Sequence, residues 1–239
     1  MFPILVIPGV AMRRVELGRV QVAWPMGVSA VEKVLLRRGL LVEDWYDAAG
    51  RVQMSRAADP GSGFVLDYVK PVYWYPGRDR AAELAQVLAR VGQWLGTDAA
   101  GAEALVRREL AAAPEGFSCL RCGDCCGRMG DAFRGRVSIE EVAWWRELGL
   151  DWLLRFVREE KRPGYSFFRA WVHPKSNEYL PRCPWLKPAK NGEPAGCRIH
   201  AARPLKCRAF PLSLEHAERA HCPGAGVDAR PRPIAPRAA

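Results

Sequence analysis

A run of four cysteines within eight residues constrains this 239-residue chain more than any other feature. The run has the spacing CxxCxxCC and consists of Cys119, Cys122, Cys125 and Cys126. Four more cysteines follow at wider intervals, namely Cys183, Cys197, Cys207 and Cys222. A two-residue gap lets both sulfurs of a pair turn toward one metal, and Gly123 and Gly127 permit the tight backbone that this requires. The pattern therefore predicts that all eight cysteines are metal ligands.

The redox state of the cysteines follows from the expected compartment. The opening residues, MFPILVIPGVA, are apolar, but they lack the basic segment of a secretory signal and are too short to cross a bilayer. We expect them to form a first buried strand, unless Met12 is the true start. No other apolar run approaches the ~20 residues of a transmembrane helix. We therefore expect a cytoplasmic protein with no membrane insertion, in which reduced cysteines bind metal; a set of disulfides is the weaker alternative.

The adjacent pair Cys125 and Cys126 suggests how the ligands divide. Neighbouring side chains usually diverge, so both sulfurs on a single ion would strain the chain. Eight thiolates therefore predict two tetra-cysteine sites, bridged by the Cys125–Cys126 peptide. We assign Cys119, Cys122 and Cys125 with one remote cysteine to the first site. Cys126 and the remaining three cysteines form the second.

The spacing is compatible with two kinds of metal centre. Three cysteines at two-residue gaps, followed by a distant one, are typical of a 4Fe-4S cluster. The Cys183-Pro184 and Cys222-Pro223 steps also occur at remote ligands of such clusters. Zinc uses the same paired gap. We favour an iron–sulfur cluster, with an electron-transfer or redox role, and keep zinc as the alternative, in which case the sites are structural.

The charge of the chain is concentrated in its second part. The chain carries 36 Lys+Arg against 26 Asp+Glu, a formal net charge of +10, of which residues 117–239 contribute +9. Arginine dominates these cations, which we attribute to a GC-rich or thermophilic composition. A basic region attracts nucleic acid or acidic proteins. A tetra-thiolate site carries about −2, however, so the same cations offset bound metal. An acidic protein or a redox partner is therefore favoured over nucleic acid.

Local patterns predict an α+β protein. In the first part, a capping box of Ser29 and Glu32 opens a helix that Gly39 ends. Strands are expected over 14–24, in two segments within 41–54 and over 63–75, and helices over 79–95 and 98–112. In the second part, Ser138 and Glu141 form another capping box that opens a helix through Leu148. A further helix over 151–161 and a strand over 164–173 follow.

We divide the chain into an N-terminal small α/β region over 1–115, a metal-organised cysteine-rich domain over 117–227 and a disordered basic tail over 228–239. The boundary coincides with a change in charge balance and in cysteine content. Residues beyond Pro181 show little periodicity, so metal crosslinks are expected to hold them. Three tryptophans at helical spacing are expected in the core, namely Trp144, Trp145 and Trp152.

The segment Phe117–Cys126 resembles the CxxCxxCC signature of the YkgJ-type cysteine-cluster family. Later segments resemble the further elements of that family in the same order: Cys183–Leu186, Gly196–His200, Arg203–Pro211 and Cys222–Gly226. The resemblance covers about residues 117–226 and leaves residues 1–116 unexplained. It implies a zinc- or iron-chelating protein, often an iron–sulfur protein.

Two other functions stay open, of which one is enzymatic and the other is not. Some relatives are called flagellin lysine N-methylases, so the resemblance implies a protein-lysine N-methyltransferase-like enzyme as one alternative. A zinc-stabilised nucleic-acid-binding module is the other. No catalytic residue can be assigned from the pattern.

Polar residues beside the cysteines have several candidate roles. His200 stands where the family usually has tyrosine, and it is more readily a neighbour of the site than a ligand. Arg198, Arg203 and Arg208 flank two of the cysteines. They could donate hydrogen bonds to sulfur, bind an anionic substrate or compensate thiolate charge, and we favour compensation.

Overall fold

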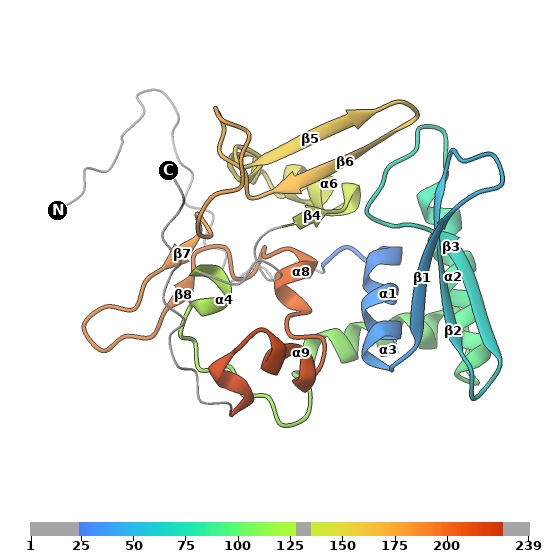
Figure 1. Cartoon of the computed structure of the whole chain (residues 1–239), viewed down its shortest axis with the longest axis horizontal. Helices are drawn as coiled ribbons and strands as arrows, with labels where there is room; N and C mark the ends of the chain where they lie inside the picture. Colours follow the sequence, from blue (N-terminus) through green and yellow to red (C-terminus); the bar gives the residue numbers. More distant parts are fainter. Residues whose placement is uncertain (1–23, 128–134, 227–239) are drawn as a thin grey trace.

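The computed structural model describes residues 24–127 and 135–226 (Figure 1). It contains helices and antiparallel sheets, which confirms the prediction of an α+β protein. The strand expected near the N-terminus, most of the 14–24 segment and the predicted disordered tail lie outside the described residues.

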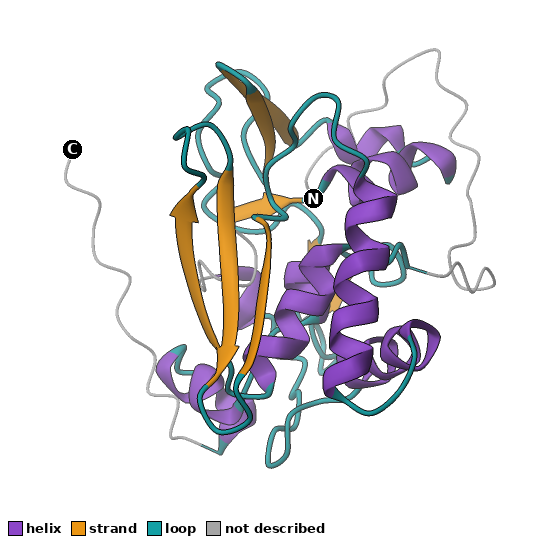
Figure 2. Cartoon of the chain, turned by 90° about the vertical axis from the view of Figure 1, so that its right-hand side faces the viewer, coloured by secondary structure: helices purple, strands orange, loops and turns teal. Residues whose placement is uncertain are grey.

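The first part of the chain is a three-stranded meander covered by helices. The strands are β1 (Leu41–Tyr46), β2 (Gln53–Asp59) and β3 (Phe64–Val69), paired antiparallel in the order β1-β2-β3. The helices are α1 (Val28–Arg37), α2 (Arg80–Trp94) and α3 (Ala99–Ala111), and they lie on one side of the sheet (Figure 2). Their apolar faces meet the sheet in a buried core that includes Val31, Leu35, Leu66, Val91 and Val106. The strands and helices predicted over 41–112 are thus confirmed.

The start of α1 differs from the prediction. Gly27 is the N-cap, without a side-chain cap, and Ser29 lies inside the helix with a buried hydroxyl. Glu32 is engaged elsewhere: its Oε1 accepts hydrogen bonds from Tyr68 Oη at 3.1 Å and from Lys70 Nζ at 3.2 Å. The predicted capping box is therefore wrong, because tertiary contacts with β3 take the glutamate that local pairing would have used.

The second part of the chain consists of short elements. They are α4 (Asp124–Gly127), β4 (Gly135–Val137), α6 (Ile139–Glu147), α7 (Asp151–Leu154), β5 (Val157–Arg162), β6 (Tyr165–Ala170), β7 (Leu186–Lys187), β8 (Gly196–Cys197), α8 (Leu205–Arg208), α9 (Leu214–Arg219) and a 3-10 turn (Pro223–Ala225). One antiparallel sheet has the order β4-β6-β5, and β7 pairs with β8. A second core forms here around Trp145, Trp171 and Leu153, all less than 2 % exposed.

The helix predicted over 151–161 is wrong in its second half. Helix α7 ends at Leu154, and the charged segment Val157–Arg162 is strand β5. It forms a hairpin with β6, in which Arg169 Nη1 donates to Glu160 Oε1 at 2.9 Å. Cross-strand pairing with β6 thus overrides the helical preference of its glutamates and lysine. The capping box of Ser138 and Glu141 is confirmed.

The tryptophans follow the prediction with one exception. Trp144 and Trp145 are buried at 5 % and 0 % exposure. Trp152 is 44 % exposed, and its ring packs edge-on against Trp185 with centroids 4.9 Å apart. Trp152 therefore lies on α7 with its ring partly at the surface, outside the buried core.

The two cores are in contact through α8. Leu205 of this helix and its C-cap Ala209 belong to the core formed by α1 to α3, and Trp24 packs against both cores. An ion pair at 2.9 Å joins Arg80 Nε of α2 to Glu140 Oε1 of α6. The division of the chain at residues 115–117 stays a prediction.

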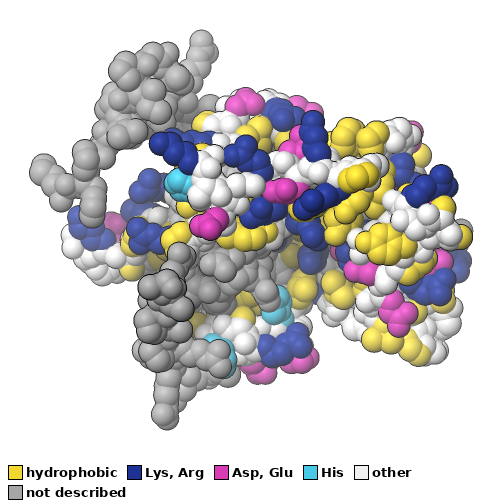
Figure 3. All heavy atoms as spheres, turned by 45° about the horizontal axis from the view of Figure 1, so that its top comes forward, with side chains coloured by type: hydrophobic (Ala, Val, Ile, Leu, Met, Phe, Trp, Pro, Cys, Tyr) yellow, Lys and Arg dark blue, Asp and Glu magenta, His cyan; other side chains and the backbone are white. Residues whose placement is uncertain are grey.

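The described surface carries mixed charges. On the face shown in Figure 3, Lys and Arg side chains lie among acidic and hydrophobic ones. Within residues 24–127 and 135–226, no helix is long and apolar enough to cross a membrane.

Candidate metal centre

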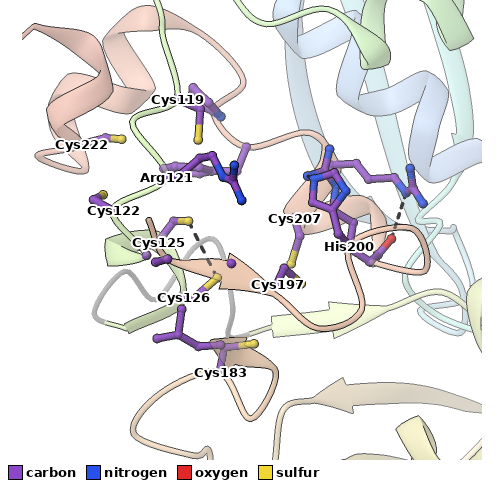
Figure 4. Close-up of a pocket in the computed structure, with 18 of the residues that line it drawn as sticks. Cys119, Arg121, Cys122, Cys125, Cys126, Cys183, Cys197, His200, Cys207 and Cys222 are labelled. Carbon is purple, nitrogen blue, oxygen red and sulfur yellow. Dashed lines mark hydrogen bonds between the residues drawn. The ribbon is translucent and has the colours of Figure 1, made fainter. Parts of the chain in front are cut away.

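All eight cysteines line one cavity of about 880 Å³ (Figure 4). They come from segments up to 103 residues apart, the distance in sequence from Cys119 to Cys222. Cys119 and Cys122 are exposed, Cys183 and Cys222 are buried, and the other four are half-buried. No disulfide joins any of the eight, all of which the structure describes. The fold therefore gathers the predicted ligand residues at one place.

Backbone contacts hold the cysteine run against the 3-10 turn Pro223–Ala225. Ser118 N–H donates to Gly224 O at 2.9 Å, which brings the residue before Cys119 next to the turn after Cys222. A side chain at position 224 would not fit, since its Cβ would lie 2.4 Å from Ser118 O. Gly123 has a φ of +82°, and a Cβ there would approach Ala195 Cβ to 2.9 Å. Glycine at both positions permits this close backbone packing.

The other cysteines are placed by separate elements. Cys183 N–H donates to Cys126 O at 2.7 Å, so the loop before β7 is attached to α4. Cys197 lies on β8, paired with Leu186 of β7. Cys207 lies on α8, and Cys222 N–H donates to Ala217 O at 2.8 Å after α9.

The adjacent cysteines do not diverge as expected. Cys125 Sγ and Cys126 Sγ lie 3.9 Å apart. Both residues belong to the short helix α4, where successive side chains differ by about 100° rather than pointing to opposite sides. Two thiolates of a tetrahedral zinc site would lie about 3.8 Å apart, given a Zn–S distance of about 2.3 Å. Strain alone therefore does not keep the two sulfurs off one ion.

The thiols around Cys222 form one neighbourhood. Burial raises the pKa of the Cys222 thiol, and so do three nearby thiols, those of Cys122, Cys125 and Cys119. Burial likewise raises the pKa of Cys122, with a further contribution from Cys125. A thiolate that raises the pKa of another must lie close to it. Cys119, Cys122, Cys125 and Cys222 are therefore neighbours, as Figure 4 also shows.

The remaining thiols form a second neighbourhood. The Cys125 thiol lowers the pKa of Cys126, but the Cys183 thiol and burial raise it, to about 12 overall. Burial raises the pKa of Cys207 to about 12, partly offset by Lys206, and Cys197 adds to the increase. Cys125 affects Cys197 and Cys207 as well, so it lies between the two neighbourhoods.

Cationic side chains line the cavity beside the thiols. Arg203 Nη1 lies 2.7 Å from His200 Nε2. Burial lowers the pKa of His200, and three arginines lower it further, namely Arg203, Arg208 and Arg121. A neutral His200 accepts the hydrogen bond from Arg203 at this nitrogen, because guanidinium can only donate. His200 is therefore engaged with arginine, in agreement with its prediction as a neighbour of the site.

Comparison with known proteins identifies the domain that contains these cysteines. Residues 118–223 match the CxxCxxCC family, which is described as a "Putative zinc- or iron-chelating domain". The matched segment includes all eight cysteines. This part of the chain is a CxxCxxCC domain. The comparison thus confirms the predicted cysteine-cluster family, while neither the curated proteins nor the solved structures gave a match to the chain.

Sequence reasoning missed two polar residues that shape the CxxCxxCC domain. Arg121 lies inside the cysteine run with a φ of +51°, and its side chain extends into the cavity (Figure 4). Lys206 precedes Cys207; its Nζ lies 5.5 Å from the centroid of the Trp171 ring and donates to Ala170 O at 3.3 Å. Burial lowers the pKa of Lys206 to about 8, although nearby cysteines oppose this. The only sequence signal for either residue is its place next to a cysteine.

The thiols of the domain are not arranged as a finished ligand shell. Among the described residues, no group of three or more His, Cys, Asp or Glu side chains has the spacing that would hold a metal ion. The chemistry of the donors nevertheless fits a metal that prefers sulfur, since eight thiols share the cavity.

Proposed function

We propose that this protein binds metal through all eight cysteines. The observation that carries the proposal is their convergence on one cavity from segments that are distant in sequence. Thiolates are soft ligands that suit zinc and iron–sulfur clusters. Their raised pKa values without metal are consistent with this role, because a bound cation reverses the effect of burial and mutual repulsion on thiolates.

The neighbourhoods support a division into two tetra-cysteine sites. We assign Cys119, Cys122, Cys125 and Cys222 to the first, which makes Cys222 the remote ligand. The second consists of Cys126, Cys183, Cys197 and Cys207. The distance of 3.9 Å between Cys125 Sγ and Cys126 Sγ supports an arrangement in which the two proposed sites lie side by side. Their shared peptide would join them, as the sequence suggested.

We favour iron–sulfur clusters, with 4Fe-4S as the leading form, over zinc. The cysteine run followed by a remote Cys-Pro step is typical of such clusters, and the cavity has room for more than a single ion. A cluster would supply one-electron transfer, so the protein would carry electrons or sense redox state. Reduced thiols suit the cytoplasm, where we place the protein. In the zinc alternative, the sites are structural.

Metal analysis of protein purified without oxygen tests the proposal. Two clusters predict iron and sulfide in equal amounts, a brown colour and absorbance near ~400 nm. Colourless protein that holds zinc would support the alternative. A metal-free protein that folds stably would overturn the metal function, provided that added iron with sulfide and added zinc also fail to bind.

A further inference from the structure

The cavity has a second wall that metal ligation does not use. Beyond the cysteines it is lined by cationic side chains, including Arg121 and Arg203, and by apolar side chains, including Leu110, Phe117 and Phe210. The Arg121 side chain extends from the cysteine run toward His200 (Figure 4).

Within the described part of the chain, Arg121 and Arg203 differ from other arginines in having no acidic partner. Elsewhere, Arg56 pairs with Asp67 and Arg169 with Glu160, at 2.7 and 2.9 Å. Among the described residues, neither Arg121 nor Arg203 forms an ion pair with a carboxylate. No carboxylate of residues 24–127 or 135–226 is therefore ion-paired with these two cavity-lining arginines.

Arg203 is held in place with hydrogen-bonding capacity to spare. Its Nη1 contacts His200 Nε2 at 2.7 Å, while its Nε is buried and has no hydrogen-bond partner. The adjacent Arg208 stabilises this turn, since its Nε donates to Arg203 O at 2.9 Å. The guanidinium has five N–H donors, so hydrogen bonds beyond the one to His200 are available to an oxyanion in the cavity.

The apolar part of the cavity suggests the rest of the ligand. Leu120, next to Arg121, is 58 % exposed and lines this cavity, as do Phe117 and Phe210. Large hydrophobic side chains beside a few converging polar groups are typical of sites for small organic molecules. Charge compensation of thiolates would need the arginines but not this apolar surface.

We propose that the cavity binds a small organic oxyanion beside the metal. Its carboxylate or phosphate group would contact Arg121 and Arg203, and its apolar body would lie against Phe117, Leu120 and Phe210. The inference rests on the proposed metal function in one respect: the metal and the organic ligand would share one cavity. In this proposal, Arg121 and Arg203 bind the oxyanion in addition to compensating the charge of the thiolates.

Binding of model anions to the full-length metal-loaded protein tests the inference. Benzoate and phenyl phosphate are titrated by calorimetry, with neutral benzamide as the isosteric control. Saturable binding of at least one anion, and much weaker binding of benzamide, is expected. The tighter anion shows whether carboxylate or phosphate is preferred. No saturable binding of either anion, or equal binding of benzamide, would overturn the inference.

Matched variants locate the binding. Arg121→Gln and Arg203→Gln should each weaken anion binding at least about tenfold, because each removes a charged hydrogen-bond donor. Arg146→Gln is the control, since Arg146 is exposed on α6 and does not line the cavity. Equal binding by all three variants would place the anion elsewhere and refute the site.

Two further measurements separate this inference from the metal proposal. Metal content is determined for the wild-type protein and for each variant. Anion binding by a protein that holds no metal would support this site and refute the metal function. Metal binding without anion binding would support the metal function and refute this site. If a variant fails to fold, phenylglyoxal modification of wild-type Arg121 is mapped by mass spectrometry. Saturating anion should protect Arg121, and unchanged modification would count against the site.

Discussion

Glu141 Oε1 accepts a hydrogen bond from the backbone N–H of Leu205 at 2.5 Å. The same carboxylate closes the capping box of α6, where its Oε2 accepts from Ser138 N–H at 2.9 Å. One buried side chain therefore joins the start of α6 to the start of α8, which carries Cys207. A local helix cap thereby also positions part of the candidate metal centre.

Replacing Glu141 should destabilise the fold and disturb the second site. Glu141→Ala leaves two buried backbone donors without a partner, so the free energy of unfolding should fall by about 2–4 kcal/mol. Urea denaturation measures this loss, and metal content reports on Cys207. Glu147→Ala is the matched control, since Glu147 is exposed near the end of the same helix. Equal stability of the two variants would show that the Glu141–Leu205 contact contributes nothing.

Single cysteine variants should remove one metal site each. Cys222→Ser should lower the metal content to about half, because it removes a ligand of the first site. Cys183→Ser should cause the same loss by removing a ligand of the second site. The double variant should bind almost no metal. Elemental analysis with a check of folding by circular dichroism measures this. Complete loss of metal from a folded single variant would mean that the eight cysteines form one unit.

Removing metal should loosen the cysteine-rich part more than the rest. The elements after Pro181 are short, and metal binding often supplies the folding free energy of such segments. Chelation without oxygen should therefore increase hydrogen exchange in residues 182–226. Exchange in α2 and α3, whose core contains no cysteine, should change little. Mass spectrometry of exchanged peptides gives both values, and unchanged exchange after confirmed metal loss would contradict the prediction.

Stability should fall at alkaline pH because of Tyr68. Burial raises the pKa of Tyr68 above its ordinary value of 10.0, and the Glu32 carboxylate raises it further. Above pH 10 the unfolded chain loses this proton while the folded protein keeps it, so the free energy of unfolding decreases as pH rises. Tyr68→Phe should make the decrease shallower. Tyr46→Phe is the control, as Tyr46 is 59 % exposed; the same pH dependence in all three proteins would exclude this role of Tyr68.

Local signals in the sequence predicted most of the regular elements. The helices over 79–95 and 98–112 form where expected, and aspartates cap both: Asp79 accepts from Ala81 and Ala82, and Asp98 accepts from Gly101. The predictions failed where distant contacts compete with local ones. Glu32 binds Tyr68 and Lys70 instead of capping α1, and β5 forms only because β6 is there to pair with it.

The candidate site shows the same limit. The spacing CxxCxxCC predicted the family, which the comparison confirms, and the chemistry of thiols predicts the ligands. Only the tertiary structure decided which remote cysteine lies beside which part of the run, because hydrogen bonds such as Cys183 N–H to Cys126 O join segments that no local preference connects. The cationic and apolar lining beside the thiols likewise exists only in the folded chain, since its residues come from α3, the cysteine run and the segment around α8.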